Sequence, residues 1–92
     1  MPLDNKQKKQ FKARAHHLKP VVRIGQHGLT PNVIKETDTC LEKHELIKVH
    51  IHEGKREERH TMAIELAKSC RSELVHSIGK VFILYREMQE ET

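Results

Sequence analysis

The chain has 92 residues, of which 36% are hydrophobic and 33% are charged, a balance that fits one small folded domain over residues 1–92 and excludes a disordered chain. No apolar run approaches the ~20 residues of a membrane-spanning helix, and the N-terminus lacks the apolar core of a signal peptide. We therefore expect a cytoplasmic protein without membrane contact, and its formal net charge of +4 favours an anionic partner.

The basic charge is concentrated at one end of the chain. Residues 1–19 hold six lysines and arginines against Asp4 alone, whereas residues 87–92 form a short acidic tail. Such a distribution is typical of a protein that holds a polyanion, although a solvated helix face is an ordinary alternative.

The first predicted helix spans about residues 3–18, where Phe11 and Ala15 fall at helical spacing and the lysines occupy the other faces. Pro20 ends it, because the residue before a proline disfavours helical geometry. The β-branched run 20–24 then predicts a strand that Gly25 closes.

A second helix is predicted from Pro31 to about His44, with Thr30 as its cap. Residues 46–52 alternate between apolar and polar, which indicates a half-buried strand. Its inward side chains are Ile47, Val49 and Ile51, and its outward side chains are Lys48, His50 and His52.

A turn over 54–56 leads to a third helix that ends near Cys70, with Glu57 and Glu58 in its first turn, where the helix dipole favours negative charge. Strands follow over 73–78 and 80–86, separated at Gly79, and the second is apolar on both faces and therefore interior. The order α-β-α-β-α-β-β predicts an α/β two-layer sandwich in which a small four-stranded mixed sheet packs against helices.

The segment Gly25-Gln26-His27-Gly28 follows a strand and precedes a capped helix. Glycines let another backbone approach closely, and a helix N-terminus favours an anion, so this loop suits a phosphate backbone. KH-type RNA-binding modules clamp single strands with a Gly-x-x-Gly loop. The alternative is that both glycines serve only the turn.

The sequence gives little support for catalysis, metal binding or nucleotide binding. The eight histidines show no zinc-ligand spacing, and no nucleophile elbow or nucleotide-binding glycine motif occurs. Cys40 and Cys70 are expected as core residues in a reducing compartment. We therefore expect no enzyme, no metal, no cofactor and no small-molecule substrate.

Three runs, AHHLKPVVRIGQHGLTPNVIKE, LEKHELIKVHI and IGKVFILYR, resemble the CRM domain (chloroplast RNA splicing and ribosome maturation) and its stand-alone bacterial members of the YhbY type, from about Lys9 to Arg86. The resemblance implies a fold like the C-terminal domain of bacterial translation initiation factor three, with a KH-like GxxG loop. It also implies RNA binding, with precursors of the large ribosomal subunit as partners in its assembly.

Carried onto this chain, the resemblance assigns RNA contact to the loop and to basic residues before it. The middle of the loop often contains a lysine in such families, whereas here Gln26 and His27 leave it neutral, so the charge must come from elsewhere. The expected RNA-binding residues are Gly25, Gln26, His27, Gly28, Lys9, Lys12, Arg14, Lys19, Arg23 and Thr30. An alternative function is a protein-interaction module that docks on a ribosomal protein through the same basic face.

Overall fold

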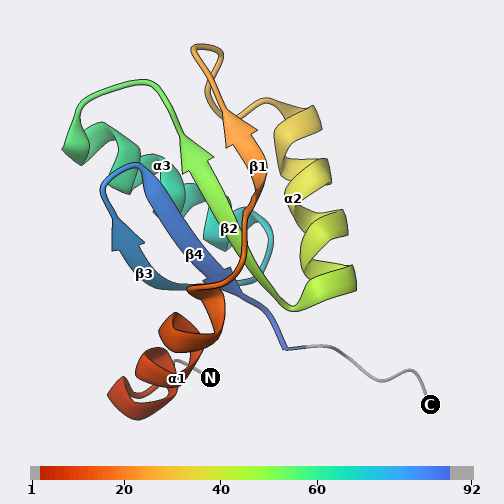
Figure 1. Ribbon diagram of the computed structural model, residues 1–92. Helices are drawn as coiled ribbons and strands as arrows, with labels where there is room; N and C mark the ends of the chain where they lie inside the picture. The colour runs from red at the N-terminus through yellow and green to blue at the C-terminus, as the bar shows by residue number, and fades with distance from the viewer. Residues whose placement is uncertain (1–2, 88–92) are drawn as a thin grey trace.

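The computed structural model describes residues 3–87, which form three helices and four strands (Figure 1). They are α1 (Asn5–Ala15), β1 (Pro20–Ile24), α2 (Pro31–His44), β2 (Leu46–Ile51), α3 (Arg56–Ser69), β3 (Glu73–Ile78) and β4 (Val81–Tyr85). The predicted element order is confirmed. Apart from Glu87, the acidic tail predicted over 87–92 lies outside the described residues.

The first two helices begin at side chains that satisfy their free backbone N–H groups. The Asp4 carboxylate accepts from the Gln7 N–H at 2.7 Å, and the Gln7 side-chain oxygen accepts from the Asp4 N–H at 3.1 Å. This capping box sets the start of α1, which is shorter than the predicted 3–18. Thr30 caps α2 as predicted, with Pro31 as the first helical residue.

The sheet is mixed and four-stranded, as predicted, with the order β1-β2-β4-β3. β1 runs parallel to β2, whereas β4 is antiparallel to both β2 and β3. β4 is therefore interior, which explains why its sequence is apolar on both faces. β1 and β3 are the edge strands.

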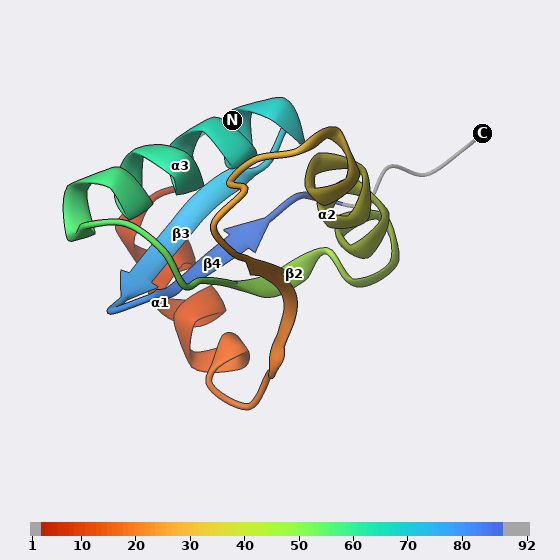
Figure 2. The same ribbon diagram turned by 90° about the horizontal axis from the view of Figure 1, so that it is seen from above.

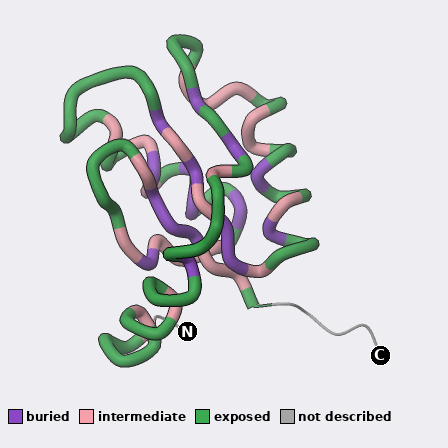
Figure 3. Tube along the Cα trace, in the orientation of Figure 1, coloured by how far each residue is buried: buried purple, intermediate pink, exposed green. Residues whose placement is uncertain are grey.

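Helices α2 and α3 cover one face of the sheet (Figure 2). The main core lies between this face and the two helices, and its largest fully buried members are Ile24, Leu41, Ile47, Ile51, Leu66 and Leu84. Cys70 is buried here, as expected, while Cys40 is only half-buried against the cluster. Figure 3 shows the buried residues gathered along the strands and the inner sides of these helices.

The predicted two-layer arrangement is wrong in one respect, because α1 packs on the opposite face of the sheet (Figure 2). A second buried cluster, distinct from the main core, consists of Ala15, Leu46, Val75 and Ile83. The three strand residues place apolar side chains on the outer face at one end of the sheet. These apolar side chains are stabilised by removal from water, and α1 buries them.

The ring of Phe11 on α1 stacks on Tyr85 of β4, with centroids 4.0 Å apart. This contact holds α1 against the end of the sheet. Among residues 3–87, no helix covers the rest of the outer face (Figure 1).

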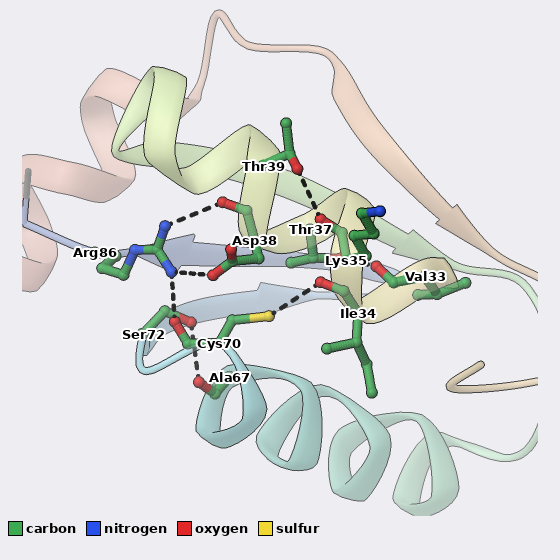
Figure 4. A network of polar contacts seen from close by, with 10 residues as sticks. All are labelled: Val33, Ile34, Lys35, Thr37, Asp38, Thr39, Ala67, Cys70, Ser72 and Arg86. Atoms are coloured by element: carbon green, nitrogen blue, oxygen red, sulfur yellow. Dashed lines mark hydrogen bonds and ion pairs between the residues drawn. The ribbon is translucent and has the colours of Figure 1, made fainter. Parts of the chain in front are cut away.

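Arg86 joins the C-terminal end of β4 to two helices (Figure 4). Its guanidinium donates to the Asp38 carboxylate at 2.5 Å, to the Asp38 carbonyl at 3.0 Å and to the Cys70 carbonyl at 2.9 Å. The Cys70 thiol donates in turn to the Ile34 carbonyl at 3.6 Å. Arg86 therefore ties α2, the end of α3 and β4 together.

The chain leaves α3 through Arg71, whose φ is 54°. The N–H of Ser72 donates to the Ala67 carbonyl at 2.8 Å, which completes the usual reversal after a helix. Glycine is the residue that normally occupies this left-handed position, so Arg71 holds it under some strain. The reversal lets β3 start at Glu73, where the sequence predicts it.

Candidate nucleic-acid interface

The GQHG segment forms a tight turn between β1 and α2. The Gly28 N–H donates to the Gly25 carbonyl at 3.1 Å, and Gln26 and His27 lie exposed at the tip. The base of the turn is fixed by the His52 N–H, which donates to the Ile24 carbonyl at 2.9 Å. The turn thus stands out from a rigid strand at the end of the molecule opposite α1 (Figure 1).

The two glycines of this turn serve different purposes. Gly28 has φ 65°, a conformation that side-chain-bearing residues rarely adopt. Gly25 does not lie in that region, and a Cβ added to it would meet nothing within 4 Å. The backbone conformation therefore favours glycine at position 28, whereas nothing among residues 3–87 requires it at position 25.

Thr30 and Arg23 flank the turn on its two sides. The Thr30 hydroxyl accepts from the Val33 N–H at 3.2 Å, so this half-buried side chain is used as the cap of α2. Arg23 is exposed on β1, where it pairs in register with His50 of β2. Among the basic residues predicted for RNA contact, Arg23 is the one near the turn.

The other predicted basic residues lie at the far end of β1. Lys9, Lys12 and Arg14 are exposed on α1, and Lys19 is exposed just before β1. The structure does not bring them to the GQHG turn, because a five-residue strand about 15 Å long separates the two groups. The predicted site therefore consists of two parts, one at each end of β1.

A shallow pocket of about 330 Å³ lies beside the C-terminal end of α1. Its apolar wall includes Leu18 and Val21, whose exposed fractions of 38% and 43% are high for large apolar side chains. Arg14 and Lys19 form the charged rim. An apolar surface with a cationic rim suits a nucleotide, whose base is flat and apolar and whose phosphate is anionic.

Three further basic positions on or beside the sheet were not among the predicted RNA-binding residues. Lys48 and His50 point outward from β2, as the alternation of that strand predicts. Lys80 is exposed and lies near enough to His50 for its charge to lower the pKa of that histidine. The alternation predicted the direction of the two β2 side chains, but it could not show that α1 leaves this part of the sheet uncovered. Only the packing of α1 decides that.

The thiols and histidines form no evident catalytic or metal centre. Burial raises the pKa of the Cys70 thiol and that of the Cys40 thiol, so neither is a ready nucleophile. Within residues 3–87, no three His, Cys, Asp or Glu side chains gather closely enough to hold a metal ion. No helix in the described part of the chain is long and apolar enough to cross a membrane.

Residues 3–86 match the CRS1 / YhbY (CRM) domain family. The chain is 46% identical over 87 residues to a Pseudomonas aeruginosa protein named "Probable RNA-binding protein", covering 95% of this chain and 84% of that one. It is 39% identical over 88 residues to a Haemophilus influenzae protein named "RNA-binding protein", covering 96% and 89%.

The fold also matches a known structure. The solution structure of a hypothetical Staphylococcus aureus protein superposes with a TM-score of 0.85 at 39% identity, covering 98% of this chain and 94% of that one. The relatives' names concern RNA binding, and the membership of the CRM family agrees with the prediction of a non-enzymatic protein.

Proposed function

This chain belongs to the CRS1 / YhbY (CRM) domain family, and from that premise we propose that it binds RNA and assists assembly of the large ribosomal subunit by holding ribosomal RNA precursors. The names of its relatives support RNA as the partner. The choice of ribosomal RNA follows the resemblance to stand-alone bacterial members of the family.

The single observation that carries the RNA contact is the open position at Gly25. A glycine without positive φ and without a close neighbour has no structural reason to lack a side chain. Close approach of a partner's backbone is such a reason. The exposed turn and the N-terminus of α2 behind it then present backbone N–H groups to a phosphate.

The charge for this contact comes from outside the turn. Arg23 neutralises phosphate beside it, while Lys12 and Arg14 on α1 neutralise phosphate at the other end of β1. These contacts position an RNA backbone without reading its sequence. Aromatic stacking contributes little, because Phe82 is buried and Phe11 and Tyr85 stack on each other.

A salt series tests the electrostatic part. Binding of an in vitro transcript of large-subunit ribosomal RNA is measured by filter retention for the wild type and for Lys12→Gln/Arg14→Gln. The double variant should bind more weakly, and the slope of log affinity against log salt should fall by about 2, since each of the two removed cations neutralises roughly one phosphate. Lys35→Gln/Lys68→Gln, which removes two exposed charges from α2 and α3, is the control and should bind like the wild type.

The turn is tested by a matched pair at Gly28. Asparagine and aspartate both tolerate the positive φ of this position, but only aspartate adds negative charge. Gly28→Asp should therefore weaken RNA binding well beyond Gly28→Asn, with both variants folded. Equal RNA affinities of Gly28→Asp and Gly28→Asn would show that the turn does not contact RNA.

Docking on a ribosomal protein through the basic face is the competing function. Pull-down of ribosomal particles before and after complete RNase digestion separates the two. Association that survives digestion favours a protein partner and contradicts RNA as the primary ligand.

A further inference from the structure

The part of the outer sheet face that α1 leaves uncovered is rich in basic side chains. We call it the open sheet face and define it by residues whose strand register places them on the same side: Arg23, Lys48, His50, His76, Ile78 and Val81. One row runs from Arg23 through His50 and Val81 to Ile78. All six are at least partly exposed, so the face is open to a partner.

This face joins the two separate parts of the predicted interface. At one edge, His76 lies close enough to Lys12 of α1 for that charge to lower the pKa of His76, after the larger effect of burial. At the other edge, Arg23 lies one residue before Ile24, whose carbonyl accepts from the His52 N–H at the base of the GQHG turn. A strand of RNA that reaches both α1 and the turn must pass over or beside this face.

The charges of the open sheet face have no carboxylate partners. Across residues 3–87, the ion pair between Arg86 and Asp38 is the one that the structure contains, and it joins the end of β4 to α2 (Figure 4). Glu73, at the end of β3 beside Tyr85, is the one carboxylate in the four strands. Cations gathered without counter-charges leave a positive potential that an anion would relieve.

The groups around His50 lower its pKa, as expected in a region of positive potential. Partial burial lowers its pKa first, and the electrostatic effects of His52, Arg23 and Lys80 lower it further. The rings of His50 and His52 lie 3.9 Å apart. No acidic group on the neighbouring strands or on the β3–β4 turn offsets these effects.

We propose that the open sheet face is a further RNA-contacting surface, across which the phosphate backbone runs between α1 and the GQHG turn. This inference rests on the proposed function, since it extends the path of the same RNA. Lys48 and His50 of this face, together with Lys80, which adjoins His50 on the β3–β4 turn, provide the contacts. The exposed side chain of Ile78 and the half-buried side chain of Val81 provide surface for sugars and bases. RNA is the occupant that the charge favours, because a phosphate backbone carries regularly spaced negative charge that would offset the positive charge of Arg23, Lys48 and Lys80.

The same arrangement couples binding to protonation. A phosphate beside His50 offsets the positive groups that hold its pKa below the ordinary value. The pKa of His50 therefore rises when RNA binds, and the complex takes up a proton. Affinity should increase as the pH falls from about 8 to about 6, by about tenfold for each unit that separates the bound from the free pKa.

The charge contribution is tested with Lys48→Gln/Lys80→Gln and the same ribosomal RNA transcript. The variant should bind about tenfold more weakly than the wild type, with a salt slope lower by about 2. Lys35→Gln/Lys68→Gln makes the same change in net charge on the helical side of the molecule and should leave both values unchanged. Circular dichroism and thermal unfolding establish that each variant is folded.

The protonation coupling is tested with His50→Gln against His60→Gln, which removes an exposed histidine of α3. His50→Gln should flatten the pH dependence of affinity, whereas His60→Gln should retain it. In NMR titrations of the wild type, the pKa of His50 should rise on addition of the transcript.

The outcomes separate this inference from the function on which it rests. If the wild type does not bind the transcript, the proposed function fails. If the wild type binds and Lys48→Gln/Lys80→Gln binds equally well, RNA binding stands and the open sheet face is not part of it. If that variant keeps its RNA affinity but no longer binds purified ribosomal proteins freed of RNA, the face belongs to a protein partner and the inference is overturned.

Discussion

Replacement of Gly25 by alanine is the sharpest perturbation that the structure offers. The added Cβ meets nothing within 4 Å, and the backbone of Gly25 does not have a positive φ. Folding should therefore not suffer. Because alanine restricts the unfolded chain, Gly25→Ala should raise the free energy of unfolding by about 0.4–1 kcal/mol.

Binding should respond in the opposite direction. If a phosphate lies against the Gly25 backbone, the new methyl group forces it outward and breaks a hydrogen bond between a backbone N–H and a charged oxygen. A hydrogen bond of that kind contributes about 1.5–3 kcal/mol, which corresponds to an affinity lower by about tenfold to a hundredfold. The signature is thus a more stable protein that binds RNA less well.

Gly28→Ala is the matched control. Its φ of 65° forces alanine into the left-handed region, which costs about 1–2 kcal/mol of stability. Urea unfolding and filter binding at one salt concentration measure both quantities for both variants. Wild-type affinity in Gly25→Ala would refute the close approach of RNA to this turn. Loss of stability in that variant would refute the claim that nothing among residues 3–87 requires glycine at position 25.

Three further outcomes concern the fold. Arg86→Ala should lower the free energy of unfolding by about 1–3 kcal/mol, because it leaves two carbonyl groups without their donor. Asp38→Asn should lower it by less than about 1 kcal/mol, since the Asp38 side chain is half exposed. Equal losses in urea unfolding would contradict this difference. Arg71→Gly should stabilise the protein by about 0.5–1 kcal/mol by relieving φ 54°, and an unchanged midpoint in the same assay would show that Arg71 is not strained. In the folded protein the pKa values of His50 and His76 lie below the ordinary 6.5, so protonation favours the unfolded chain. The stabilising contribution of these two histidines should be complete above pH 6.5 and should decrease as the pH falls from there toward their folded pKa. In thermal unfolding, His50→Gln/His76→Gln should lose less stability than the wild type over that range.

The sequence predicted much of the architecture because local signals are strong at particular residues. Thr30 and Pro31 set the start of α2, and the alternation of 46–52 set both the position of β2 and its buried face. The apolar run 81–85 indicated an interior strand, which pairs with two neighbours in the sheet. Each of these depends on hydrogen bonding or burial that repeats over a few residues, so it is visible in the order of residues alone.

The candidate site was predicted less completely, for a physical reason that lies in packing. Periodicity shows which side of an element is apolar, but it does not show which face of a sheet a helix covers. The helical side of α1 containing Phe11 and Ala15 could serve either face; contact with Tyr85 and Ile83 places it on the outer one. That choice separates the basic residues of α1 from the GQHG turn.

The sequence by itself determined the elements, the glycine turn with its cap, and the excess of basic residues at one end of the chain. Only the tertiary structure decided that Gly25 and Gly28 differ in their backbone requirements, and that α1 covers one part of a sheet face and leaves the cations of the other part unpaired within residues 3–87. Those properties depend on backbone angles and on contacts between residues distant in the chain, which no short stretch of sequence encodes.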